Sequence, residues 1–288
     1  MIWIAKMFNA IRYNEATYRL MKWWYGLGNR SVKAYVFVCS TGRCGTNTIS
    51  DVFANSNEVS SLHEPYPTMY SNHSDLPLVQ QRQLSLLKRK YLNILKAANY
   101  KLAYVESNHM FIKTFFQIAS EFLPSDKVKI IHVKRDPFSV ASSFYAINSI
   151  PGKPPTGDRF LLDPFADGNL LDLRQELTSE NFRHDFYKCL WYWYETEQRI
   201  AKAKLLTADK IDWLFLETKD LNSPTKIQEL ISFVGLTDVM PNIQDLVGMR
   251  SNQKKVQKSH FSKIDFKIYE ERFNQLLLSK GFMPHTEC

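Results

Sequence analysis

The chain has 288 residues and a formal net charge of +8, with 44% hydrophobic and 23% charged residues. This length suits one large domain or two small ones, and the composition excludes a globally disordered chain. The excess positive charge is carried by residues 1–35 and 249–263, each with a net charge of +5. The rest of the chain is nearly neutral, which argues against a uniformly basic nucleic-acid scaffold and favours local sites for an anionic ligand.

The sparse cysteines have no CxxC spacing, so we expect no zinc or disulfide framework but reduced thiols in a cytoplasmic protein. No apolar run approaches the ~20 residues that span a bilayer, and the first residues lack the long apolar core of a signal peptide. Residues 1–32 predict an amphipathic helical extension. Its apolar positions recur at helical spacing, at Trp3, Ile4, Met7, Phe8 and Ile11. We favour packing of this helix on its own domain, although a basic helix with tryptophan also suits peripheral contact with a membrane.

Predicted strands and helices alternate along the rest of the chain. In chain order they are a strand at 33–39, a helix at 47–56, a strand at 58–63, a helix at 78–98, a strand at 101–107, a helix at 111–122, a strand at 127–134, helices at 137–147 and 182–204, a strand at 212–217, and helices at 225–235 and 264–279. This alternation predicts an α/β fold of three layers, with a mainly parallel central sheet and helices on both faces. We therefore assign residues 33–288 to one domain.

Residues 148–180 differ in composition from the rest of this domain, with four prolines and three glycines. A long irregular segment within a compact domain is usually functional or disordered. We interpret the segment as a mobile lid over a site.

The segment between the first strand and the first helix is rich in small residues. A turn at this place in an α/β sheet presents backbone N–H groups to an anion, and the helix N-terminus adds the positive end of its dipole. Glycines allow close approach of the backbone, an arginine neutralises the anion, and hydroxyl groups donate hydrogen bonds. The candidate ligand-binding residues are Gly42, Arg43, Cys44, Gly45, Thr46, Asn47 and Thr48.

A second candidate anion site follows the strand at 127–134. Arg135 ends this strand, and Ser143 lies eight residues later in the next helix. Arg135 is expected at the sheet edge where ligands bind, and its guanidinium suits bidentate contact with a phosphate. The G-x4-G-K-[ST] string of nucleotide triphosphatases does not occur in the sequence, so a Mg·ATP-dependent, kinase-like phosphotransferase is a weaker alternative.

These two segments together resemble the sulfotransferases that use 3′-phosphoadenosine-5′-phosphosulfate (PAPS). VFVCSTGRCGTNTISDVF is similar to that family's 5′-phosphosulfate loop, and HVKRDPFSVASSFY is similar to its 3′-phosphate motif. DWLFLETKDL resembles a later segment of the family. The resemblance implies a P-loop-like fold, PAPS as donor, 3′,5′-bisphosphoadenosine (PAP) as product, and no required metal. Arg43 in place of lysine resembles the carbohydrate and tyrosylprotein branches, whereas Asn47 stands where many members carry a hydroxyl residue.

The resemblance leaves two candidates for the general base. Glu64 follows the second strand, where the carbohydrate and tyrosylprotein branches carry a catalytic glutamate. His109 follows the third strand, where the small-molecule branch has a catalytic histidine preceded by a lysine that is missing here. We favour Glu64, keep His109 as the alternative, and expect Arg43 to neutralise charge on the leaving phosphate. We interpret His63 and Glu106 as structural.

Three further segments are notably basic or aromatic. Residues 249–263 resemble in position the family's loop over the adenosine and 3′-phosphate, with the candidates Arg250, Lys254, Lys255 and Lys258. Residues 82–101 hold six basic residues and no acid, which we interpret as a solvated helix face. Residues 191–194 are consecutive aromatics in one helix. We expect most of them in the core and at least one facing outward, because four consecutive residues go round a helix.

The sequence therefore predicts a PAPS-dependent sulfotransferase that transfers a sulfuryl group to a hydroxyl or amine. Its acceptor is expected to be a small molecule, a natural product or a glycan, and no nucleic-acid partner is expected. A non-enzymatic protein that binds anionic membranes or nucleic acid through its basic ends is a further alternative. That alternative leaves the two internal motifs unexplained.

Overall fold

A computed structural model of the chain describes residues 14–70, 76–240 and 263–285. Five strands form one sheet in the order β2-β3-β1-β4-β5, and each neighbouring pair is parallel. The strands are β1 (Ala34–Cys39), β2 (Val59–His63), β3 (Ala103–Ser107), β4 (Val128–Lys134) and β5 (Asp212–Glu217). The predicted α/β fold with a parallel sheet is confirmed.

The central strand β1 has buried side chains on both faces. Val36 and Val38 belong to the hydrophobic core of one face, whereas Tyr35 and Phe37 belong to that of the other. A strand that is covered on both faces needs apolar side chains in both directions, which explains the continuous apolar run in its sequence. On the second face Phe37 stacks on Phe111, with ring centroids 4.7 Å apart.

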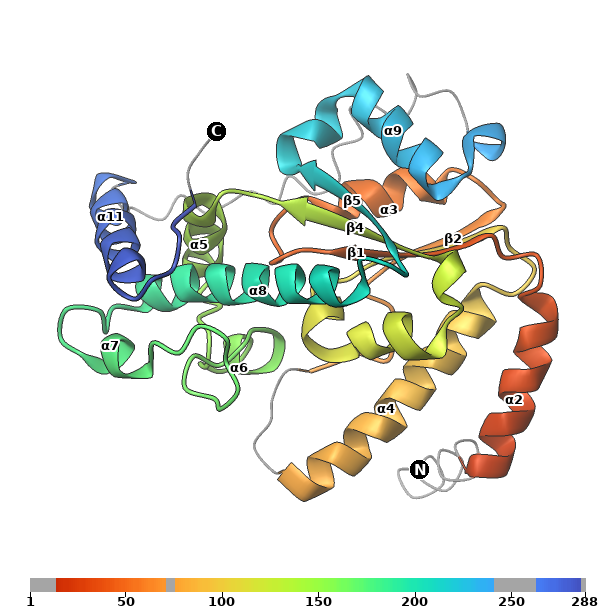
Figure 1. Cartoon of the computed structure of the whole chain (residues 1–288), viewed down its shortest axis with the longest axis horizontal. Coiled ribbons are helices and arrows are strands. Elements are labelled where there is room, and N and C mark those ends of the chain that lie inside the picture. Colours follow the sequence, from red (N-terminus) through yellow and green to blue (C-terminus); the bar gives the residue numbers. More distant parts are fainter. Residues whose placement is uncertain (1–13, 71–75, 241–262, 286–288) are drawn as a thin grey trace.

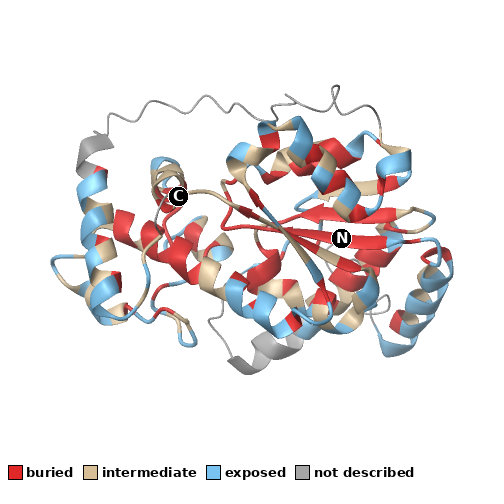
Figure 2. Ribbon diagram, turned by 45° about the horizontal axis from the view of Figure 1, so that its top comes forward, coloured by how far each residue is buried: buried red, intermediate tan, exposed pale blue. Residues whose placement is uncertain are grey.

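Helices cover both faces of the sheet (Figure 1). α3 (Thr46–Ala54) and α9 (Pro224–Val234) share the core of one face. α4 (Leu76–Ala97) and the C-terminal half of α8 (Asp185–Thr207) lie on the other, and α2 (Glu15–Gly28) packs against α4. α5 (Pro137–Ala146) and α11 (Lys263–Ser279) pack on α8 beyond the carboxyl ends of the strands. Figure 2 shows buried residues concentrated in the strands and on the helix faces turned toward them.

The predicted N-terminal extension is described from residue 14 onward, where it forms α2. Asn14 caps this helix, because its side chain accepts a hydrogen bond from the amide of Thr17 at 2.8 Å. The apolar positions predicted between residues 3 and 11 lie outside the described residues. Within the described part of the chain, no helix combines the length and the apolar character that crossing a membrane requires.

Residues 111–122, predicted as one α-helix, instead form two π-helical turns, η1 (Phe111–Phe115) and η2 (Ile118–Phe122). In this arrangement the ring of Phe111 contacts both Phe115 and Phe116, at centroid distances of 5.3 and 5.7 Å. Apolar periodicity predicts a helical segment, but the choice between α and π turns depends on such tertiary packing.

The segment 148–180 contains two short helices, α6 (Gly157–Phe160) and α7 (Arg174–Thr178). Leu161 and Leu171 lie in the hydrophobic core. The fully buried Glu195 of α8 accepts hydrogen bonds from the amides of Leu170 and Leu171, at 3.1 and 2.7 Å. Much of the segment therefore packs as part of the domain, and its action as a mobile lid stays a prediction.

The four consecutive aromatic residues at 191–194 of α8 are all buried. The expectation that at least one of them faces outward is therefore wrong. The reason is that α5, α11 and η1 pack around α8 and leave all four side chains buried.

Candidate active site

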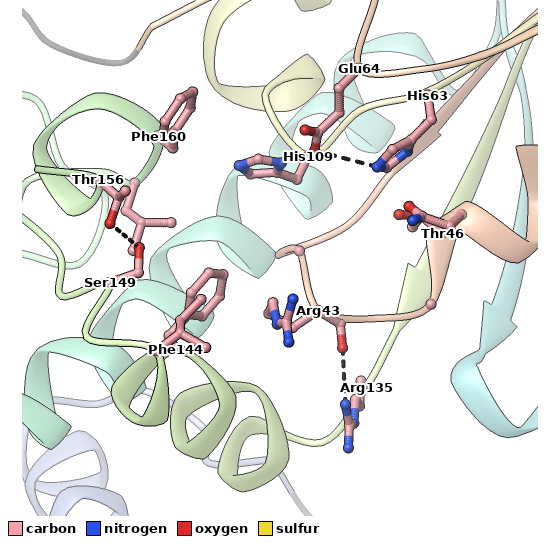
Figure 3. A pocket seen from close by; sticks show the side chains of 15 residues that line it. Arg43, Thr46, His63, Glu64, His109, Arg135, Phe144, Ser149, Thr156 and Phe160 are labelled. Carbon is pink, nitrogen blue, oxygen red and sulfur yellow. Dashed lines mark hydrogen bonds and ion pairs between the residues drawn. The ribbon is translucent and has the colours of Figure 1, made fainter. Parts of the chain in front are cut away.

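A pocket of about 650 Å³ lies at the carboxyl end of the sheet (Figure 3). Its walls come from the loops after β1, β2, β3 and β4 and from residues 144–161. The strand order reverses at β1, because β3 and β2 lie on one side of it and β4 and β5 on the other. Ligands of open α/β sheets bind in the crevice at such a reversal, so the pocket has the position of a binding site.

The loop after β1 has the backbone of an anion-binding turn. Gly42, Arg43 and Gly45 adopt left-handed φ angles of 87°, 60° and 75°. A Cβ atom at Gly42 would lie 3.2 Å from Cζ of Phe144, so both the backbone angle and the available space favour glycine there. Gly45 precedes α3 and provides no side-chain cap, which leaves amide groups of the first helical turn available to an anion.

The two predicted anion motifs meet at this loop. Nε of Arg43 donates a hydrogen bond to Oγ of Ser143 at 2.7 Å. Nη1 of Arg135 donates to the carbonyl oxygen of Arg43 at 3.0 Å. Both arginines line the pocket, and Nε1 of Trp193 fixes the backbone of Arg135 by donating to its carbonyl at 2.8 Å. Two segments that lie far apart in the sequence are thus brought together around the main chain of Arg43.

The other predicted loop residues fall into two groups. Thr46 and Asn47 line the pocket, whereas Cys44 and Thr48 do not belong to its described walls. The Cys44 thiol is buried beside the hydroxyl of Thr41, and burial raises its pKa to about 11. Cys44 is therefore a neutral thiol at physiological pH. Its carbonyl accepts a hydrogen bond from Thr218 at 3.1 Å, which holds the loop against the segment after β5.

The two candidate bases lie side by side in the pocket. Nδ1 of His109 is 2.6 Å from Oε1 of Glu64. This hydrogen bond holds the pKa of Glu64 below its ordinary value of 4.5. Burial lowers the pKa of His109 below its ordinary value of 6.5. At neutral pH the pair is therefore a carboxylate that accepts a hydrogen bond from a neutral imidazole.

Glu64 lies on a strained turn that is held by buried polar groups. Its φ of 46° is left-handed, and its amide donates to the carbonyl of Ser107 at 3.0 Å. The next carbonyl, that of Pro65, accepts a hydrogen bond from Nζ of Lys90 at 3.0 Å. Lys90 in turn forms an ion pair with Glu106 at 2.6 Å, in which the side chains are 1% and 0% exposed. The buried pair therefore anchors the turn that carries Glu64.

Lys90 corrects the interpretation of residues 82–101 as a solvated helix face, because it is one of the most buried side chains of the protein. Its partner Glu106 accepts two further hydrogen bonds, from the Tyr104 hydroxyl at 2.6 Å and from Nδ2 of Asn108 at 2.9 Å. Charge density along the sequence does not reveal this pair, because the acid comes from β3 and the base from α4.

His63 also lines the pocket, next to Glu64. Its Nε2 lies 4.0 Å from Oε1 of Glu64, and its Nδ1 lies 2.7 Å from Oγ of Ser107. The Ser107 hydroxyl also lies 2.6 Å from Oγ of Ser50 in α3. These contacts fix the imidazole of His63 at the end of β2.

No sequence pattern singled out Lys113, a second buried lysine beside the pocket. Its Nζ donates to the carbonyl of Phe160 at 2.6 Å and to the Tyr192 hydroxyl at 2.8 Å. The Tyr192 hydroxyl donates to the carbonyl of Thr41 at 2.8 Å. Burial lowers the pKa of Lys113 well below its ordinary value of 10.5. Lys113 and Tyr192 thus connect residues 148–180 to the loop after β1.

A sequence profile described as "Sulfotransferase domain" matches residues 33–280. The chain belongs to the sulfotransferase family. The match includes both anion motifs, both candidate bases and residues 148–180. It confirms the resemblance predicted from the two motifs.

Solved structures similar to this sulfotransferase domain include two proteins described as sulfotransferases. The sulfotransferase from Alicyclobacillus acidocaldarius is 10% identical with a TM-score of 0.45, and the match covers 86% of this chain and 95% of that chain. The sulfotransferase domain from the curacin biosynthetic pathway is 14% identical with a TM-score of 0.46, covering 77% and 79%. Retinol dehydratase in complex with androsterone and inactive cofactor PAP is 16% identical with a TM-score of 0.35, covering 77% and 67%. The comparison with curated protein sequences found no match.

In this sulfotransferase domain, the side of the pocket away from Thr46 is formed by residues 144–161 (Figure 3). Its apolar side chains are Phe144, Ile147, Phe160 and Leu161. The hydroxyl groups of Ser149 and Thr156 are hydrogen-bonded to each other at 3.1 Å. The pocket therefore has a cationic loop on one side and a largely apolar wall on the other.

The basic candidates Arg250, Lys254, Lys255 and Lys258 lie outside the described residues. Among residues 14–70, 76–240 and 263–285, no cluster of three or more His, Cys, Asp or Glu side chains could hold a metal ion. Arg43 and Arg135 are the cationic side chains that the described walls of the pocket offer to an anion.

Proposed function

We propose that this sulfotransferase uses PAPS as its donor and transfers the sulfuryl group to a hydroxyl or amine of a small-molecule, natural-product or glycan acceptor. The observation that carries the proposal is the meeting of Arg43 and Arg135 at a glycine-containing turn, in the same pocket as the Glu64–His109 pair.

The described residues fit the anionic groups of PAPS. The turn after β1 offers backbone amides without a side-chain cap, and Arg43 adds a guanidinium beside them. This combination suits the 5′-phosphosulfate. Arg135 and Ser143 are the proposed ligands of the 3′-phosphate, as the resemblance of their segment to the family's 3′-phosphate motif implies.

In the proposed reaction Glu64 acts as general base. The acceptor oxygen or nitrogen forms a bond to sulfur, while the bond between sulfur and the bridging phosphate oxygen breaks. That oxygen keeps the electron pair, and Arg43 neutralises the charge that develops on the phosphate. The proton of the acceptor passes to the Glu64 carboxylate. His109 orients this carboxylate through the 2.6 Å hydrogen bond.

The proposal is tested by calorimetry with PAP and by turnover of labelled PAPS in an acceptor screen. We expect PAP to bind and to raise the melting temperature. Arg135→Ala should weaken PAP binding at least about tenfold, because hydrogen bonds between charged groups are stronger than hydrogen bonds between neutral groups. Arg30→Ala, at an exposed position before β1, is the matched control and should bind PAP normally. Failure of the wild-type protein to bind PAP at millimolar concentration would rule out the proposed donor.

A further inference from the structure

Helix α2 has two apolar stripes, and one of them is covered by packing against α4. Tyr18 and the half-buried Met21 and Tyr25 belong to the core that α2 shares with α4. Leu20, Trp23, Trp24 and Leu27 form a second stripe, which we call the outer stripe. Their exposed fractions are 63%, 60%, 62% and 38%. The i, i+3, i+4, i+7 spacing places all four side chains on one side of the helix.

The outer stripe is unusual because it exposes two large indole rings. Trp23 and Trp24 have ring centroids 6.5 Å apart, so they form one continuous aromatic surface. Single exposed apolar residues are common on protein surfaces, but a contiguous apolar stripe on one helix face marks an interaction site. Tryptophan in particular favours the boundary between water and the acyl region of a bilayer.

The charges around the outer stripe are mainly positive. Arg19 is exposed on the same helix, and Arg30 and Lys33 are exposed just after it. Lys22 is also exposed, but its Nζ lies 5.6 Å from the ring centroid of Tyr91 in α4, toward the packed side of α2. Glu15 is the acid in α2, and it is already paired with Arg19 at 3.2 Å and with Lys88 at 2.7 Å. Residues 1–35 carry a net charge of +5. Exposed indole rings on a segment with this net positive charge are complementary to an anionic lipid surface.

The position of α2 leaves the pocket free. α2 ends at Gly28, shortly before the amino end of β1 at Ala34, whereas the pocket lies at the carboxyl ends of the strands. In Figure 1, α2 is therefore at one end of the sheet, and α5 and α6 are at the other. α2 and the pocket are therefore at opposite ends of the sheet.

We propose that the outer stripe docks on an anionic lipid bilayer, with α2 lying in the interface. The side chains of Trp23 and Trp24 insert at the level of the headgroups, and the exposed Arg19, Arg30 and Lys33 contact anionic phosphates. Docking of this kind holds the enzyme at a membrane while the pocket stays open to water. The proposal rests on α2 and the basic residues next to it, and it is independent of the donor and the acceptor.

The test uses the full-length chain and vesicles of phosphatidylcholine, with or without phosphatidylglycerol. We expect co-sedimentation with the phosphatidylglycerol vesicles, a blue shift of tryptophan fluorescence, and loss of binding when NaCl rises from about 0.1 M to about 1 M. Trp23→Ser combined with Trp24→Ser should weaken vesicle binding at least about tenfold. Leu20→Ser combined with Leu27→Ser is a second, independent variant of the same stripe and should also weaken it.

The matched control is Leu205→Ser combined with Leu206→Ser in α8, where the side chains are 79% and 65% exposed. This variant should bind vesicles like the wild type, and circular dichroism should show that all variants are folded. The proposal is overturned if the wild type does not bind at low salt, or if both stripe variants bind as well as the control. It is also overturned if the wild type does not bind vesicles but forms a dimer that the stripe variants dissociate. In that case the outer stripe binds a second copy of the chain. Protection of Trp23 and Trp24 from acrylamide quenching without vesicles would instead assign the stripe to a contact within the chain.

Discussion

Nδ1 of His109 and Oε1 of Glu64 are 2.6 Å apart, so the two side chains that compete for the role of base form one hydrogen-bonded pair. Oε2 of Glu64 has no hydrogen-bond partner among the described residues. In the proposed reaction, Oε2 is therefore the oxygen that takes the proton of the acceptor. The Nδ1 proton of His109 is donated to Oε1, and this hydrogen bond limits rotation of the carboxylate. This geometry favours Glu64 as the base and His109 as a positioning residue.

Variants at the pair separate these roles. Glu64→Gln should lower kcat by about 10²–10⁴-fold, because an amide cannot accept the proton, while the Kd for PAP stays unchanged. His109→Asn keeps a donor at the position of Nδ1 but has no basic group, so we expect kcat within about tenfold of the wild type. His109→Ala removes the hydrogen-bond donor and should lower kcat more than His109→Asn does. Steady-state kinetics and PAP calorimetry measure both effects. If His109→Asn is as inactive as Glu64→Gln, the imidazole is the base.

The pH dependence of kcat/KM gives an independent test of the same assignment. The hydrogen bond from His109 lowers the pKa of Glu64, so its carboxylate stays ionised down to a pH below the ordinary value of 4.5. We expect activity to be retained as the pH falls to that value and to be lost below it. In His109→Ala the pKa of Glu64 should rise, which moves this acid limb to higher pH. An acid limb between pH 4.5 and 6.5 that His109→Asn abolishes would assign the base to the imidazole.

Local patterns in the sequence predicted the parts of the site that depend on local structure. Gly42 and Gly45 indicated a tight turn after the first strand, and Arg135 directly follows β4 (Val128–Lys134), so both could be placed at the edge of the sheet before the fold was known. The positions of Glu64 and His109 followed from the strands that precede them. Their mutual hydrogen bond could not be predicted, because it depends on the pairing of β2 with β3.

Burial of polar residues was the main feature that sequence patterns could not predict. Lys90 lies in a run of basic residues that resembles any solvated helix face, and its partner Glu106 comes from a different element. Lys113 lies in a segment with helical periodicity, but the π turns and its contact with Tyr192 arise from tertiary packing. In each case the deciding interaction joins residues that no short sequence window contains.

The contact between Arg43 and Ser143 leads to a prediction for nucleotide binding. The hydroxyl of Ser143 accepts from Nε of Arg43 at 2.7 Å and holds the guanidinium beside the loop. Ser143→Ala should raise the Kd for PAP by about tenfold, since the hydrogen bond involves a charged group. Ser142→Ala is the matched control, because the Ser142 hydroxyl is buried without a hydrogen-bond partner among the described residues. Equal affinities of the two variants for PAP, measured by calorimetry, would contradict a role for Ser143.

The buried pair of Lys90 and Glu106 should affect both stability and turnover. Lys90→Met leaves the Glu106 carboxylate buried without its cation, which should lower the free energy of unfolding by about 3–5 kcal/mol. The same variant removes the hydrogen bond to the carbonyl of Pro65, next to Glu64. We therefore expect kcat to fall while the Kd for PAP changes little. Thermal and urea unfolding give the stability, and kinetics at a temperature where the variant is folded give kcat.

The double variant Lys90→Met with Glu106→Gln distinguishes a buried charge from a lost contact. In the wild type, the Tyr104 hydroxyl donates a hydrogen bond to Oε2 of Glu106 at 2.6 Å. Glutamine removes the charge, and its side-chain oxygen still accepts this hydrogen bond. The double variant should therefore be more stable than Lys90→Met alone, a non-additive result expected for residues in contact. It should not recover kcat, because the hydrogen bond to Pro65 is still missing.

As a control, Glu15→Gln breaks the solvent-exposed pair with Lys88 and should leave the melting temperature nearly unchanged. A double variant that is no more stable than Lys90→Met would show that the lysine contributes through packing rather than through its charge.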